Sequence, residues 1–193
     1  MLKGLDIANY FIDKSKQSGE RYAVTNMKVQ KLLYYTQSLH LAMYNESLFE
    51  EELQAWVYGP VCPPVYQEYK VFGSNTISQP ALTIVDFNTD IENLLQEVWQ
   101  YFGRYHAYLL SDMTHDEQPW LKARKGLPSD APSIESIDKE DMKQLGKDKL
   151  LQIEIEHPAY TPVISRILED TLDDINNQHI MTANEFRNWL AAL

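Results

Sequence analysis

The residues whose types could do chemistry lie between positions 106 and 117. They are His106, Asp112, His115, Asp116 and Glu117. Such side chains can bind a metal ion or act as general acids and bases. Their spacing does not place two histidines on one helical face at i, i+4, and Asp and His in turn-like segments commonly cap backbone groups. We therefore predict capping and loop-fixing roles for this cluster, with no metal site and no catalytic residue.

Cys62 is the single cysteine of the chain, so no intramolecular disulfide can form. It lies beside three prolines, and no neighbouring residue type suggests a general base that would activate it as a nucleophile. A buried, packed thiol is the prediction here. The sequence also lacks a Gly-rich phosphate loop, HExxH, GxSxG and CxxC. These absences favour a protein that is not an enzyme and that needs no cofactor.

Aromatic side chains concentrate in the first third of the chain, at Tyr34, Tyr35, Trp56, Tyr58, Tyr66 and Tyr69. Such side chains pack hydrophobic cores and also anchor protein interfaces. We expect core packing for most of them, and a binding role stays open for those that reach the surface.

Helical periodicity accounts for most of the chain. Thr25 is a good N-cap and Asn45 a plausible stop for a helix over residues 26–44, on whose apolar face His40 is predicted to be a hydrogen-bonded core residue. Thr89 and Glu92 have the spacing of a capping box. The other expected helices cover residues 3–17, 65–72, 90–102, 105–113, about 120–124, a segment around 137–145, 163–176 and a last one from Thr182.

Alternation of apolar and polar residues from Phe49 to Tyr58 predicts a short strand or two, ended by Gly59-Pro60. Pro63-Pro64 suits the first turn of the helix that follows. We expect residues 74–88 to form a loop, and a short strand within it is left open. The predicted fold is mainly α, a single compact helical domain with a short β element and a C-terminal helical extension.

Length, composition and charge narrow the class of protein. The 193 residues are 44% hydrophobic and 23% charged, as expected for one domain with a short appendage. No window reaches the roughly 18 to 20 apolar residues of a membrane span, and the start lacks a secretory signal pattern, so a cytoplasmic protein is expected. The net charge of -11 disfavours direct nucleic-acid binding. Residues 131–193 carry six basic and twelve acidic residues, which is either a solvated surface or a surface complementary to a basic partner.

Three ordered motifs resemble the Panacea domain, a family that includes SocA-like and phage-associated proteins. They are the helix phrase Thr25-Asn26-Met27-Lys28-Val29-Gln30-Lys31-Leu32-Leu33-Tyr34-Tyr35, the phrase from Phe49 through Ala55-Trp56-Val57-Tyr58-Gly59-Pro60-Val61 to Val65-Tyr66, and His115 followed by Pro119-Trp120. The resemblance covers about residues 3–146. It predicts a Panacea-like antitoxin domain over residues 1–146, with residues 147–193 as an acidic helical extension.

The resemblance implies an antitoxin that neutralises a cognate protein toxin by direct binding. One SocA-like member instead works as an adaptor that hands its toxin to a protease, so a role in delivering a client to a cytosolic protease is the alternative. Association into a homodimer is left open. The candidate partner-binding residues are Tyr34, Trp56, Tyr58, Tyr66, His115 and Trp120 in the domain, with Asp170 and Asp174 in the extension.

Overall fold

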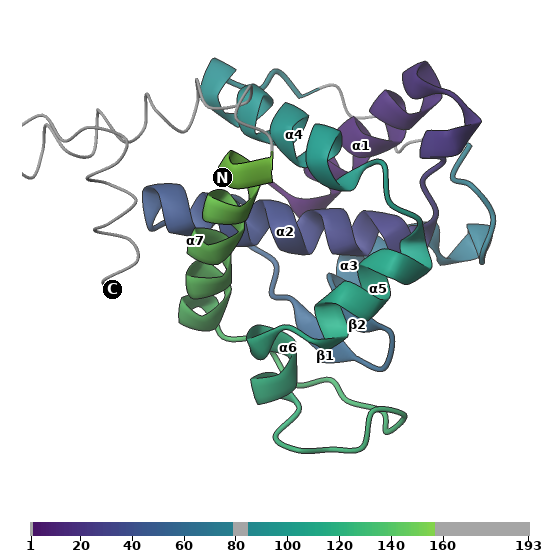
Figure 1. The fold of residues 1–193 in the computed structure, drawn as a ribbon. Helices are drawn as coiled ribbons and strands as arrows, with labels where there is room; N and C mark the ends of the chain where they lie inside the picture. The colour runs from purple at the N-terminus through teal and green to yellow at the C-terminus, as the bar shows by residue number, and fades with distance from the viewer. Residues whose placement is uncertain (1, 79–84, 157–193) are drawn as a thin grey trace, which may run out of the picture. The chain divides into compact units, whose positions relative to one another are not determined.

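The computed structural model describes residues 2–78 and 85–156. Within these ranges the chain forms seven α-helices and one two-stranded antiparallel hairpin (Figure 1). The α-helices are α1 Gly4–Ser18, α2 Asn26–Tyr44, α3 Pro63–Tyr69, α4 Thr89–Phe102, α5 Ala107–His115, α6 Gln118–Ala123 and α7 Lys139–Glu156. The strands are β1 Gln54–Trp56 and β2 Gly59–Val61, and short 3-10 helices cover Glu20–Tyr22 and Lys70–Phe72. The predicted mainly helical class with a short β element is confirmed.

The chain divides into two compact units, Met1–Lys147 and Asp148–Leu193. The first unit holds α1 to α6, the hairpin and the start of α7. The helices predicted over residues 163–176 and from Thr182 lie outside the described residues. No helix of the described ranges is long and apolar enough to cross a membrane.

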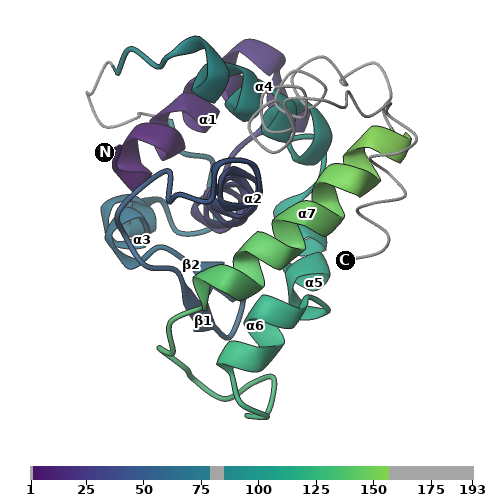
Figure 2. The same ribbon diagram turned by 90° about the vertical axis from the view of Figure 1, so that its left-hand side faces the viewer.

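Helix α2 is the centre of the first unit. It packs against α1, α3, α4, α5 and β2, and Figure 2, which looks nearly along its axis, shows α1 and α4 on one side and α3 and the hairpin on the other. Fifteen of its nineteen residues are buried, as expected for a helix surrounded by other elements. The Thr25 hydroxyl accepts a hydrogen bond from the Lys28 N–H at 3.3 Å, and Asn45 ends the helix in the left-handed conformation. Both predicted ends of this helix are confirmed.

The predicted strand from Phe49 to Tyr58 is wrong in its extent. Only Gln54–Trp56 pair as β1, and Gly59-Pro60 begins the second strand instead of ending the first. The pairing of Trp56 with Gly59 leaves Val57 and Tyr58 as a two-residue turn. Gly59 has a φ of +90°, which a glycine adopts without strain. The apolar alternation nevertheless predicts burial correctly, because Phe49, Leu53 and Ala55 are all buried.

Two helix starts differ from the sequence prediction by a residue or two. The N-cap of α4 is Asn88, whose side chain accepts from the Ile91 N–H at 2.9 Å, so the Thr89–Glu92 capping box is wrong. Asn is more favourable than Thr at an N-cap, and Asn88 directly precedes Thr89 in the sequence. Helix α5 begins at Ala107 because His106 is its N-cap. In the described part of residues 74–88, the one strand-like contact is an isolated bridge between Thr25 and Thr76.

Candidate functional site

Five side chains make hydrogen bonds to the backbone of the hairpin. Each makes a hydrogen bond to one of its carbonyl oxygens: Arg124 Nη1 to Ala55 (3.2 Å), Trp120 Nε1 to Trp56 (2.9 Å), His115 Nε2 to Val57 (3.0 Å), Ser111 Oγ to Tyr58 (3.1 Å) and Lys31 Nζ to Pro60 (3.0 Å). We call these five residues the hairpin clamp. Lys31 lies on α2, Ser111 and His115 lie on α5, Trp120 lies on α6, and Arg124 directly follows α6. The hairpin is therefore held by one helix that precedes it and by two consecutive helices that follow it in the sequence.

The protonation of His115 follows from this contact. A carbonyl oxygen can only accept, so Nε2 must carry the proton that it donates to Val57. Burial is the main cause that lowers the pKa of His115 below its ordinary 6.5, so the ring is neutral at pH 7. Its ring centroid lies 4.4 Å from that of Trp120.

Gly59 fits closely against the clamp. A Cβ atom at this position would lie 2.5 Å from Thr114 Oγ1 and 2.7 Å from Lys31 Nζ, both too short for a real contact. The helices therefore approach the hairpin backbone at a distance that only glycine permits. This approach is what lets the Lys31 ammonium reach the Pro60 carbonyl.

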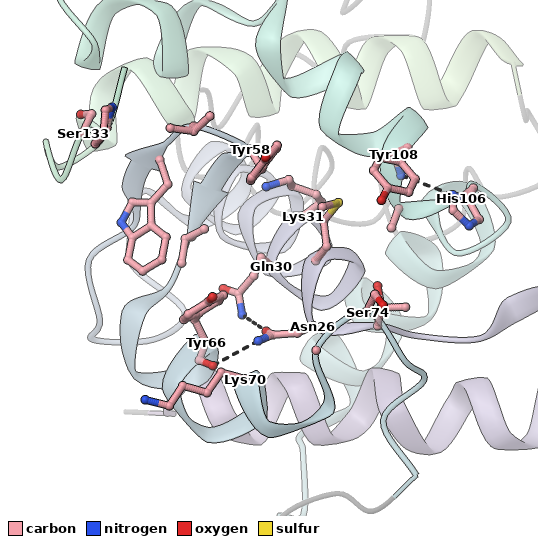
Figure 3. Close-up of a pocket in the computed structure, with 18 of the residues that line it drawn as sticks. Asn26, Gln30, Lys31, Tyr58, Tyr66, Lys70, Ser74, His106, Tyr108 and Ser133 are labelled. Atoms are coloured by element: carbon pink, nitrogen blue, oxygen red, sulfur yellow. Dashed lines mark hydrogen bonds between the residues drawn. The ribbon is translucent and has the colours of Figure 1, made fainter. Parts of the chain in front are cut away.

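The hairpin forms one wall of a groove of about 780 Å³. The other walls are the start of α2, helix α3 with the 3-10 turn after it, the start of α5, and the loop at residues 132–134 (Figure 3). Three predicted binding residues, Trp56, Tyr58 and Tyr66, meet here, and the rings of Trp56 and Tyr66 lie 4.9 Å apart in an edge-to-face arrangement. Tyr58 is 66% exposed, as are Tyr108 (64%) and Ile134 (76%), which also line the groove.

A hydrogen-bonded chain of amides ties the helices under the groove together. Asn26 Nδ2 donates to the Tyr66 carbonyl at 3.1 Å, and Gln30 Nε2 donates to Asn26 Oδ1 at 2.9 Å, as drawn in Figure 3. The Gln30 side-chain oxygen accepts from the Cys62 N–H at 2.8 Å. These hydrogen bonds link α2 to α3 and to Cys62, the residue that follows β2, beneath the groove.

The remaining predicted residues have other positions. Tyr34 is fully buried and Trp120 is 3% exposed, so their side chains serve the interior. His115 and Trp120 belong to the hairpin clamp and face the hairpin backbone. The partner-binding role predicted for these three residues stays a prediction. Asp170 and Asp174 lie outside the described residues.

His106 and Glu117, from the cluster of histidines and carboxylates at residues 106–117, have separate structural roles. His106 caps α5, and Glu117 accepts a hydrogen bond from the Tyr35 hydroxyl at 3.1 Å in the interior. The described residues include no group of three His, Cys, Asp or Glu side chains placed to hold a metal ion. Cys62 is fully buried, and burial is the main cause that raises the pKa of its thiol to about 12, so at pH 7 it is not a nucleophilic thiolate. His40 is buried, with Nδ1 2.8 Å from the Glu46 carbonyl, as predicted.

Sequence reasoning missed several groove residues, among them Lys31, Lys70, Tyr108 and Ile134. Their positions depend on tertiary packing, which no local pattern encodes. The sequence does show that Ile134 is a branched apolar residue directly after Pro132-Ser133, in a mostly polar segment. The buried Arg124 shapes this linker by donating to the carbonyls of Pro128 (2.5 Å) and Ala131 (2.7 Å), which places residues 132–134 beside the groove.

One protein-family model matches the part of the chain that contains the hairpin. Residues 29–121 match the family model described as the antitoxin SocA-like, Panacea domain. The matched segment runs from α2 into α6 and contains the hairpin and four of the five clamp residues. No curated protein and no solved structure gives a significant match to the chain.

Proposed function

We propose, from the premise that residues 29–121 are a Panacea domain of the SocA-like antitoxins, that this protein neutralises a cognate protein toxin by direct contact. The family match is the observation that carries the proposal. Neutralisation of this kind needs no catalytic step, and it takes place in the cytoplasm where such a toxin would act.

The geometry supports a binding role. Trp56 and Tyr58 stand on a hairpin whose carbonyls are held by three helices, and Tyr58 and Tyr108 are exposed beside a concave surface. Aromatic side chains on a rigid support lose little conformational entropy when a partner binds, which favours affinity. The Panacea domain therefore presents a preformed surface to its toxin.

Co-expression tests the proposal. Each protein encoded next to this gene is expressed alone and together with this chain, and growth and complex formation are measured. We expect one neighbour to arrest growth alone, to be harmless with this chain, and to co-elute with it. Toxin released from the complex by denaturation and refolding should regain full activity with unchanged mass.

The outcomes separate the mechanisms. A toxin that disappears only when a cytosolic protease is present would assign the adaptor role instead of direct inhibition. A toxin recovered with altered mass would indicate covalent modification and contradict a non-enzymatic antitoxin. The antitoxin role itself is lost if no neighbouring product is toxic or if this chain rescues none of them.

A further inference from the structure

The groove differs in charge from the rest of the molecule. The chain carries 28 Asp and Glu residues and a net charge of -11. None of the described residues that line the groove is an Asp or a Glu, whereas Lys31, Lys70 and His106 all line it. The start of α2 also opens onto it, and the N-terminus of a helix carries partial positive charge. An anionic group is thus repelled by much of the protein but not by this groove.

Lys70 is the accessible cation of the groove wall. Its side chain is exposed, and its ammonium contacts the Gln67 side chain at 2.6 Å but no carboxylate of the described residues. Lys31 lies deeper and is 1% exposed. Its ammonium donates to the Pro60 carbonyl, and the ion pairs within the described ranges do not include it. A buried ammonium without a counter-ion is unfavourable, and a carboxylate placed in the groove would lower that cost through its field.

The apolar part of the groove is shaped for side chains. Trp56 and Tyr66 form an aromatic corner, and the exposed Tyr58, Tyr108 and Ile134 stand on three different elements around the opening. Exposed apolar groups that surround a concave surface mark protein interaction sites. A nucleic-acid strand fits less well, because its affinity depends on several phosphate contacts and the molecule as a whole is strongly acidic.

We propose that the groove binds a carboxylate-bearing peptide segment of the protein partner, in which an Asp or Glu lies close to an aromatic or branched apolar residue. Lys70 pairs with the carboxylate at the edge of the groove, and Trp56, Tyr58 and Tyr108 enclose the apolar side chain. The inference rests on the proposed function, since it names the part of a toxin that this antitoxin would recognise. It allows the toxin to be basic overall, provided that the inserted segment is acidic.

Selection from a displayed library of random linear peptides tests this without knowledge of the toxin. The full chain is the bait, and enriched peptides are measured by fluorescence polarisation against variants. Lys70→Glu reverses the exposed groove cation, and Lys139→Glu makes the same change in net charge at an exposed position outside the groove. Tyr58→Ser and Leu127→Ser form a second pair, because Leu127 is exposed and does not line the groove.

We expect enriched peptides with an acidic residue near an apolar one. Their binding should weaken about tenfold with Lys70→Glu and with Tyr58→Ser, and stay unchanged in the two controls. A peptide whose acidic residue is replaced by Lys should regain affinity for Lys70→Glu. The proposal is overturned if the enriched peptides are basic, if Lys70→Glu binds them as the wild type does, or if no peptide depends on the groove. A fluorescently labelled octaribonucleotide is measured in the same polarisation assay, and its binding at the groove, with no acidic peptide enriched, would also overturn the proposal.

The same variants in the growth assay separate this inference from the proposed function. Wild-type rescue that persists with Lys70→Glu and Tyr58→Ser would retain the antitoxin and remove the groove as its docking site. Failure of the wild type to rescue would remove the antitoxin, whatever the peptide selection shows.

Discussion

Gly59 allows the hairpin backbone to lie close to Thr114 and to the clamp residue Lys31. Gly59→Ala adds a Cβ that meets Thr114 and Lys31, and it also places a side chain at a φ of +90°. Gly19→Ala is the matched control, because Gly19 has a φ of +85° and no atom within 4 Å of the added carbon. The control should lose about 1 to 3 kcal/mol of unfolding free energy from backbone strain. Gly59→Ala should lose about 1 to 3 kcal/mol more, from the forced displacement of its neighbours.

Urea unfolding of both variants measures these losses. Equal losses for Gly59→Ala and Gly19→Ala would show that the clamp yields without cost, and that Gly59 is needed only for its backbone conformation.

Lys31 makes stability depend on pH in a predictable direction. Burial lowers the pKa of Lys31 from 10.5 to about 7 in the folded protein. Between these two values the unfolded chain binds the proton more tightly than the folded chain does. The free energy of unfolding should therefore rise with pH above about 7, by up to about 1.4 kcal/mol per pH unit. Below about 7 the contribution is constant, because both states are protonated.

Lys31→Met removes this titration and keeps a side chain of similar length. The difference in unfolding free energy between wild type and Lys31→Met should grow in favour of the wild type from about pH 7 to about pH 9. His115, which faces Lys31, titrates below 6.5 and so outside this window. Lys28, whose pKa burial lowers to about 8, is present in both proteins and cancels in the difference. Parallel pH profiles of the two proteins would contradict the assignment.

At the scale of elements, the sequence predicted helices better than the hairpin. Helix α2 was predictable to the residue because its two ends are local: Thr25 caps one and Asn45 accepts the left-handed conformation at the other. The hairpin was not, because alternation shows which residues face inward but not where the chain reverses. That reversal depends on Gly59 and on clamp donors that lie up to 69 residues away in sequence, as Arg124 does from Ala55.

The candidate site was predictable in part for the same reason. Trp56 and Tyr58 are close in sequence, and Tyr66 follows after strand β2, in the first turn of α3. His115 and Trp120 were predicted as binding residues from their motif, and their hydrogen bonds to hairpin carbonyls could not be read from the sequence. A sequence motif indicates which residues occur together. It does not indicate which of their side chains face the solvent.

The hairpin clamp predicts that loss of the Trp120 indole N–H destabilises the protein more than loss of the Trp56 indole N–H. Trp120→Phe keeps an aromatic ring but removes the side-chain donor to the Trp56 carbonyl. We expect a loss of about 1 to 3 kcal/mol and faster amide hydrogen exchange across residues 54–61. Trp56→Phe is the control, because its indole N–H donates only to the nearby Gln54 side chain at 2.8 Å. Comparable losses and exchange in both variants would show that the clamp does not hold the hairpin.

At the scale of the whole molecule, two charge patterns would act at different stages of binding. Residues 131–193, with six basic and twelve acidic residues, would act at long range and speed encounter with a basic partner, whereas Lys70 acts at short range once contact is made. Reversal of charge in the acidic C-terminal segment should therefore change the association rate constant. Lys70→Glu should instead change the dissociation rate constant.

The double variant Asp170→Lys, Asp174→Lys tests the long-range part with the toxin found by co-expression. Its association rate constant should fall about three- to tenfold at low ionic strength. The difference should shrink as ionic strength passes about 0.15 M, where the screening length is about 8 Å. Asp13→Lys, Glu20→Lys is the control, since it reverses two exposed acidic residues at the other end of the sequence and makes the same change in net charge. Equal slowing in both double variants would show that only net charge matters, and an unchanged rate in a folded Asp170→Lys, Asp174→Lys protein would show that the C-terminal segment takes no part in guiding the toxin.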